Sequence, residues 1–129
     1  MEIGIKGRAE DTVSEKNVAS KIGSGVVDVY ATPCLIGLME EAAQTSVAPF
    51  LGEGMTTVGT KLNVSHDAAT PVGMKVWAES ELIEEDGRRL VFSVKAYDEC
   101  GLIGQGEHER FVVKLDRFME KVGAKKKEY

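Results

Sequence analysis

The chain has 129 residues, of which 43% are hydrophobic, and it carries a formal net charge of −5 at pH 7. This length and apolar content suit one compact domain with a sizeable core, so we expect a single domain over residues 1–129. The acidic balance argues against a general nucleic-acid binder, because such a protein needs a basic face to displace counterions from phosphates.

The sequence contains no clear signal for a membrane or an oxidising compartment. No apolar run approaches the ~20 residues of a membrane span, and the apolar stretch at the N-terminus is too short and too polar for a signal peptide. Cys34 and Cys100 lack the close spacing of metal or redox pairs, and we interpret both as reduced thiols. A cytoplasmic protein with no membrane partner is therefore expected.

The N-terminal part predicts a strand followed by a weakly anchored segment. Alternating apolar and polar residues from Ile3 predict a short strand running towards Val13. Ser14 can cap a short helix through Lys21, but few apolar side chains line that helix. A glycine-rich break follows. We therefore expect residues 14–29 to be a mobile connector that can act as a lid.

Residues 31–51 predict a buried helix around which the other elements pack. Thr32 can cap this helix, and Pro33 fits its first turn. Apolar side chains fall on two stripes, so little of the circumference is polar and other structure must surround the helix. Glu40 lies on the second stripe, where an unpaired carboxylate is costly to ionise. Glu40 therefore has either a partner or a chemical task.

The chain after the Gly52-Glu53-Gly54 turn changes to the two-residue period of β-strands. Four strands are predicted, over residues 58–66, 76–83, 89–98 and 102–115. In the first of them, strict alternation from Val58 places Thr60 and His66 on the same face. His66 therefore continues the apolar face of its strand.

The last residues predict a short helix and a basic tail, over residues 116–129. Asp116 can cap this helix and Gly123 can end it. Lys125-Lys126-Lys127 then forms a solvated tail, and a phosphate-bearing ligand passing nearby is the less favoured interpretation.

The element order predicts an α+β protein of the hotdog fold, in which an antiparallel sheet wraps around one central helix. Such a small sheet leaves one edge and one side of the helix open. Two subunits that pair edge to edge would cover both, so we expect a homodimer.

Several motifs together resemble one enzyme family over roughly residues 29–122. They are Thr32, Gly37-Leu38-Met39-Glu40, Gly59-Thr60, His66-Asp67-Ala68-Ala69-Thr70-Pro71, Gly87-Arg88-Arg89-Leu90 and Gly106-Glu107-His108-Glu109-Arg110. This set is similar to the fluoroacetyl-CoA thioesterase group of hotdog thioesterases. The resemblance implies a catalytic set of Thr32, Glu40 and His66, and it places Gly59 and Arg110 at the acyl or CoA part of the ligand. It also implies an acyl-CoA thioester as substrate, hydrolysed to free acid and CoA at the interface of a dimer, with no metal and no further cofactor.

The segment before Thr32 departs from this family. The fluoroacetyl-specific enzyme has an aromatic-rich lid there, whereas residues 14–29 contain no Phe, Tyr or Trp. The resemblance therefore does not extend to fluoroacetate selectivity. A small apolar acyl group is the default for a pocket lined by residues such as Leu35, Met39 and Val64.

The same residues also have structural interpretations. Thr32 is a good helix cap on its own account, and Glu40 can be a buried acid held by Arg110 or Arg89. His66 can be a half-buried structural histidine, as we interpret His108. A non-catalytic hotdog module that binds acyl-CoA or another small apolar ligand is the alternative function, and a hotdog dehydratase is a weaker competitor.

The chemistry of thioester hydrolysis fits the three residue types. Glu40 can attack the carbonyl carbon or act as base on a water, His66 can polarise the carbonyl or carry a proton, and Thr32 can donate a hydrogen bond. Thr32 and Glu40 are eight helical residues apart, about 12 Å along the axis. Either the substrate bridges that gap within one protomer or the neighbouring subunit completes the set. We favour the second arrangement, because the resemblance implies a site at the dimer interface and the helix needs a partner to cover it.

Overall fold

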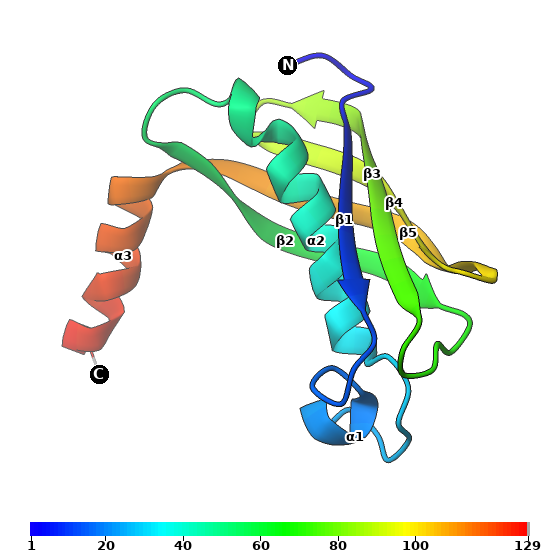
Figure 1. Cartoon of the computed structure of the whole chain (residues 1–129). Coiled ribbons are helices and arrows are strands. Elements are labelled where there is room, and N and C mark those ends of the chain that lie inside the picture. The colour runs from blue at the N-terminus through cyan, green and yellow to red at the C-terminus, as the bar shows by residue number, and fades with distance from the viewer. Residues whose placement is uncertain (129) are drawn as a thin grey trace.

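The computed structural model describes residues 1–128, which form a five-stranded antiparallel sheet with a long helix, α2, packed against it (Figure 1). The elements in chain order are β1 (Lys6–Thr12), α1 (Ala19–Ile22), α2 (Thr32–Val47), the 3-10 turn η1 (Ala48–Phe50), β2 (Met55–His66), β3 (Lys75–Asp86), β4 (Arg89–Asp98), β5 (Gly101–Lys114) and α3 (Leu115–Glu128). Within this described part, none of the helices combines the length and apolar character needed to cross a membrane.

The strand order across the sheet is β1-β3-β4-β5-β2, so β1 and β2 are its two edges. The predicted strand over residues 89–98 is confirmed with the same bounds, and those before and after it are confirmed with small shifts. Gly87, at a φ of 60°, provides the left-handed residue of the two-residue loop between β3 and β4.

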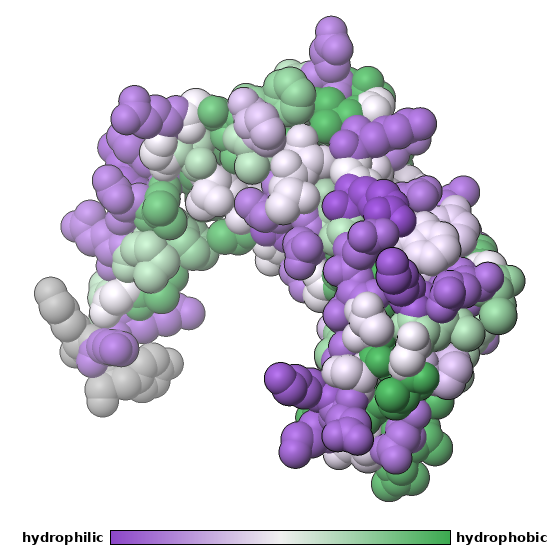
Figure 2. Space-filling view, viewed as in Figure 1, coloured by the Kyte–Doolittle hydropathy of each residue, from purple (hydrophilic) through white to green (hydrophobic). Residues whose placement is uncertain are grey.

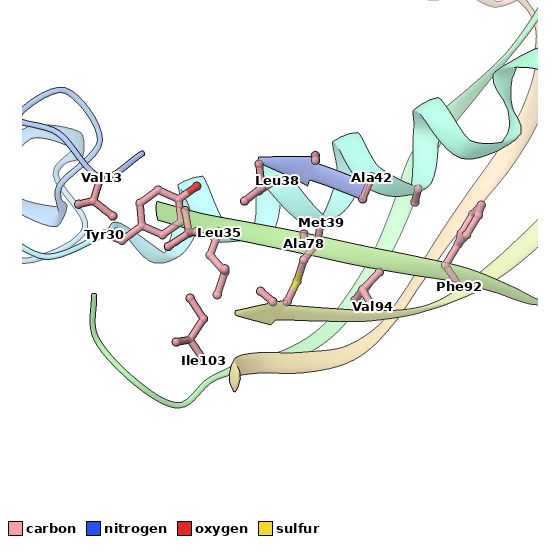
Figure 3. Close-up of a cluster of buried hydrophobic side chains, with 14 of the residues drawn as sticks. Val13, Tyr30, Leu35, Leu38, Met39, Ala42, Ala78, Phe92, Val94 and Ile103 are labelled. Atoms are coloured by element: carbon pink, nitrogen blue, oxygen red, sulfur yellow. The ribbon is translucent and has the colours of Figure 1, made fainter. Parts of the chain in front are cut away.

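The core lies between α2 and the inner face of the sheet (Figure 3). The helix contributes Leu35, Leu38, Met39, Ala42, Ala43 and Val47, all buried. The sheet contributes Val76, Ala78, Leu82, Leu90, Phe92, Val94, Ala96 and Ile103. The prediction that other structure would wrap around this apolar helix is therefore confirmed.

Helix α2 approaches one edge of the sheet closely. A Cβ atom added to Gly7 on β1 would lie 2.1 Å from the backbone oxygen of Ala42 on α2, and no real side chain tolerates that distance. Glycine therefore lets the β1 edge contact the helix backbone directly. The opposite edge, β2, has fewer contacts with α2.

The connector between β1 and α2 contains less helix than predicted. The helix expected from Ser14 is reduced to α1, which begins after Val18 and has no side-chain cap. The reason is local competition, because the Asn17 side chain accepts a hydrogen bond from the Ser14 N–H and donates one to the Thr12 carbonyl. The part of the connector outside α1 is held by isolated β-bridges, such as the one between Val18 and Tyr30.

The C-terminal helix is longer than predicted. Helix α3 begins at Leu115 and continues past Gly123 through Glu128, so the basic residues 125–127 belong to it. Asp116 lies inside its first turn rather than at the cap. Gly123 lacks the left-handed conformation that ends many helices, and good helix formers flank it. Figure 1 shows α3 projecting away from the sheet, with Leu115 46%, Met119 54% and Val122 42% exposed.

Strand β2 contains a bulge that the sequence pattern does not predict. Gly59 pairs with Arg110 and Lys61 pairs with Glu109, so Thr60 is an extra residue between two regular ladders. Positions 57 and 59 therefore share the inner face with positions 62, 64 and 66. The prediction that Val58 and Thr60 share the face of His66 is wrong.

Candidate active site

The structure brings Thr32 and His66 into direct contact. Thr32 is the first residue of α2, and His66 is the last residue of β2. Thr32 Oγ1 lies 2.7 Å from His66 Nδ1. The N-cap of α2 is Ala31, and no side chain caps the helix, so the predicted capping role of Thr32 is wrong. Its hydroxyl bonds to the histidine instead of to the helix backbone.

The surroundings of the His66 ring favour its neutral form. Burial lowers its pKa below 6.5, against smaller opposing effects from the Ala68 backbone and the Asp67 carboxylate. The second ring nitrogen, Nε2, is buried and has no hydrogen-bond partner among residues 1–128. A neutral imidazole with one nitrogen on a hydroxyl and the other unpaired can exchange a proton with a bound ligand.

A cleft of about 250 Å³ opens on this pair. Thr32, His66 and residues 67–69 form one wall. The connector forms the other, through Ala19, Ser24, Gly25, Val27, Val29 and Tyr30. The segment that we interpret as a lid therefore lies directly over the hydroxyl and imidazole groups.

Glu40 and Arg110 form a second cluster. Arg110 Nη1 lies 3.7 Å from Glu40 Oε2, and the Arg110 side chain is only 8% exposed against 39% for Glu40. A Cβ atom at Gly59 would lie 2.7 Å from that same carboxylate oxygen. Gly59 therefore leaves space for the Glu40 carboxylate, and Arg110 is the partner that the position of Glu40 requires. Arg89 pairs elsewhere, with Glu84 and Glu109.

Thr57, which the sequence interpretation did not single out, and His108, which it treated as structural, hold the Arg110 guanidinium in place. Its Nε donates to Thr57 Oγ1 at 2.8 Å, and its Nη2 donates to the Thr57 carbonyl at 3.0 Å. Its Nη1 lies 3.2 Å from His108 Nε2. The position of Thr57 follows from the bulge and gave no sequence signal. His108 lies two residues before Arg110 on the same face of β5, and this spacing was the available signal.

The two clusters occupy different places in one subunit. His66 and Gly59 are seven residues apart on β2, roughly 20 Å with one residue in the bulge. Within residues 1–128 no hydrogen bond or ion pair joins Thr32 or His66 to Glu40 or Arg110. The described residues also contain no group of three His, Cys, Asp or Glu side chains placed to hold a metal ion.

Comparison with known proteins adds independent evidence. A family model described as fluoroacetyl-CoA-specific thioesterase matches residues 13–116. The chain belongs to this family. The fluoroacetyl-CoA thioesterase of Streptantibioticus cattleyicolor is 44% identical over 98 residues, which is 76% of this chain and 70% of that protein.

Solved structures agree with membership of this thioesterase family. A mutant of the fluoroacetyl-CoA-specific thioesterase FlK, in complex with fluoroacetate and CoA, is 35% identical with a TM-score of 0.86, and the match covers 92% of this chain and 99% of that one. A hot-dog-like protein from Thermanaerovibrio acidaminovorans is 25% identical with a TM-score of 0.87, over 97% and 93%. The expected hotdog fold is confirmed, and the chain is a thioester hydrolase.

Proposed function

We propose that this enzyme hydrolyses a small acyl-CoA thioester to the free acid and CoA. Thr32, Glu40 and His66 form its catalytic set, and Gly59 and Arg110 contact the substrate. The observation that carries the proposal is the 2.7 Å contact between Thr32 Oγ1 and His66 Nδ1 beside a cleft, with the other ring nitrogen buried and unpaired. The fluoroacetate and CoA of the FlK complex support this substrate class.

Thr32 and His66 act on the thioester carbonyl. The N-terminal end of α2 carries the positive end of the helix dipole, which stabilises negative charge on a carbonyl oxygen. The Thr32 hydroxyl donates a hydrogen bond there or to the neutral imidazole beside it. His66 Nε2 is available to exchange a proton with the reacting groups. These roles require no group beyond the substrate and water.

Glu40 provides the carboxylate that either activates water or attacks the acyl carbon of the thioester. As a base, it takes a proton from water while the water oxygen bonds to the acyl carbon, the carbon–sulfur bond breaks and CoA leaves with a proton. As a nucleophile, its oxygen bonds to the acyl carbon while the carbon–sulfur bond breaks and CoA leaves as the thiolate. Water then cleaves the resulting anhydride to the free acid and the Glu40 carboxylate, and the thiolate takes up the proton that is released. In both routes Gly59 gives the carboxylate space, and the Arg110 guanidinium lies beside it at 3.7 Å.

We further propose that Glu40 reaches the Thr32 and His66 of the partner subunit in a homodimer. If the β2 edges of two subunits pair antiparallel about a two-fold axis, the His66 end of one strand lies beside the Gly59 end of the other. This pairing would bring the two clusters together across the interface. The exposed apolar side chains of α3 and the open hollow beside that helix support a second copy there (Figure 2).

The test is a panel of acyl-CoA thioesters of increasing acyl length, with acetyl-CoA and fluoroacetyl-CoA included. We expect release of free CoA thiol, detected with a thiol reagent, to be fastest for small acyl groups. Thermal unfolding with the same compounds provides the control for binding. Stabilisation by CoA esters without any thiol release would favour the non-catalytic binding module and contradict the proposal.

A further inference from the structure

His108 is buried in a part of the protein that needs no histidine for packing alone. Its side chain is 0% exposed and lies on the inner face of β5, opposite Leu62 on β2 and Phe92 on β4. Its ring stacks on Phe92, with 6.2 Å between the ring centroids. The surroundings are apolar on two sides, so a phenylalanine or leucine would fill this space without polar atoms to satisfy.

The hydrogen bonds of His108 fix which ring nitrogen carries the proton. Nδ1 lies 2.9 Å from the Lys61 carbonyl oxygen, which can only accept, so Nδ1 must be the protonated nitrogen. In the neutral ring Nε2 is then an acceptor, and Arg110 Nη1 donates to it at 3.2 Å. A charged ring would oppose N–H to N–H and place two cations together. Burial lowers the pKa of His108 first, and the Arg110 charge lowers it further.

This acceptor completes a rigid frame around Arg110. Thr57 holds the Nε and Nη2 side of the guanidinium through its hydroxyl and its carbonyl. His108 holds the remaining nitrogen, Nη1, and this is the nitrogen that faces Glu40 Oε2 at 3.7 Å. A Cβ atom at Gly59 would lie 3.3 Å from both Nη1 and the His108 ring. Without His108, the nitrogen nearest Glu40 and Gly59 would be free to change its hydrogen bond.

We propose that His108 is a positioning residue of this thioesterase. As a neutral acceptor protonated on Nδ1, it fixes the Arg110 guanidinium beside Glu40 and Gly59, so that Arg110 meets the substrate in one orientation. This inference rests on the proposed contact between Arg110 and the acyl-CoA ligand. It also gives a task to a histidine that the sequence interpretation treated as structural.

The first test uses two variants that remove the same ring but keep different halves of its hydrogen bonding. His108→Gln can place an amide oxygen at the position of Nε2 and accept from Arg110. His108→Asn can place an amide N–H at the position of Nδ1 and reach only the Lys61 carbonyl. We expect His108→Gln to keep kcat/KM for acetyl-CoA within about threefold of the wild type, and His108→Asn to lose about tenfold, mainly through KM. Equal losses in both variants would overturn the proposal.

The second test asks whether His108 acts through Arg110. In an Arg110→Ala background, His108→Asn should cause no further loss, because the group that it positions is gone. A tenfold loss in that background would show that His108 acts independently and would overturn the inference. If Arg110→Ala alone leaves kcat/KM unchanged, the proposed role of Arg110 in substrate binding fails instead, and the inference falls with it.

A third measurement leaves His108 unchanged, so it does not depend on whether His108 variants fold. Nitrogen-15 NMR of the wild-type enzyme labelled in histidine reports which ring nitrogen carries the proton. We expect His108 to show a protonated Nδ1 and an unprotonated Nε2 across neutral pH. The Thr57→Val variant removes a hydrogen bond from the other side of Arg110, and we expect it to shift the His108 signal. A protonated Nε2 on His108 would overturn the proposal.

Discussion

The two ends of the candidate site are built differently. At one end, exposed Thr32 and half-buried His66 share a single hydrogen bond below a connector attached by isolated bridges. At the other end, the buried Arg110 makes hydrogen bonds from all three guanidinium nitrogens to β2 and β5. For the function we propose, this difference suits a division of tasks, because a ligand can enter where few contacts must break, whereas charge must be fixed where it stabilises a reaction.

The largest effect is expected from removing the charge of Glu40, beside Arg110. Glu40→Gln keeps the shape of the side chain but removes its charge, so kcat should fall about 10³-fold. Folding should survive, because the Glu40 side chain is 39% exposed and Arg110 keeps its bonds to Thr57 and His108. Thiol release and thermal unfolding check both parts. An active variant with near wild-type turnover would make Glu40 a structural residue.

A mixing experiment tests whether the two ends meet across subunits. Thr32→Ala and Glu40→Gln proteins should each be inactive, but their heterodimer would hold one site with both groups intact. After random subunit exchange at equal concentrations, about a quarter of the wild-type sites should be restored. Heterodimer formation is confirmed by mass spectrometry of differently tagged chains. Proven heterodimers without activity would contradict a site shared in this way.

Removing the Thr32 hydroxyl, which makes a single hydrogen bond to His66, should have a smaller effect. Thr32→Val removes only the group that contacts His66 and should lower kcat/KM about 10- to 100-fold, whereas Thr32→Ser should retain activity.

The pH profile sharpens the same comparison. Because burial lowers the pKa of His66, its neutral form persists to lower pH than for an ordinary histidine. The acid limb of kcat/KM should therefore lie below pH 6.5, with activity lost as pH falls through the pKa of the folded enzyme. An acid limb that lies above this value in the wild type, or one that His66→Gln leaves in place, would show that another group controls it.

The smallest expected effect concerns mobility. Residues 14–25 should exchange amide hydrogens at least tenfold faster than α2, because only short helix α1 and scattered backbone bonds hold them. Hydrogen exchange followed by mass spectrometry measures both segments in one sample. Similar slow exchange in the two segments would exclude a connector that opens as a lid.

Sequence reasoning succeeded where local pattern and tertiary structure agree. Strands β3, β4 and β5 follow the two-residue period over most of their length, with one register shift after Leu82 and one after Ala96. Glycines mark the turns between them, so their bounds were predicted within a few residues. The two-striped helix α2 was also recognisable, since few surfaces other than a curled sheet can bury it. The family resemblance grouped Thr32 with His66, but neither it nor any sequence pattern predicted their direct contact across 34 residues.

The errors occur where a distant contact outweighs a local preference. Thr32 has the local chemistry of a helix cap, but its hydroxyl bonds to His66. The position of Thr57 depends on how β2 pairs with β5, which no single strand reveals. His108 was assigned no task because its significance lies in the orientation of Arg110. Tertiary hydrogen bonds, which periodicity cannot report, determine all three.

The bulge at Thr60 also bears on aggregation. Strand β2 is a 12-residue edge, and a long flat edge is a template for open-ended strand addition between molecules. The extra residue bends the edge and interrupts its ladder of backbone groups. A second chain can continue the sheet only if its own edge has a matching bend, as a copy related by a two-fold axis does. The residue that disturbs the alternation of β2 therefore also works against open-ended strand addition at this edge.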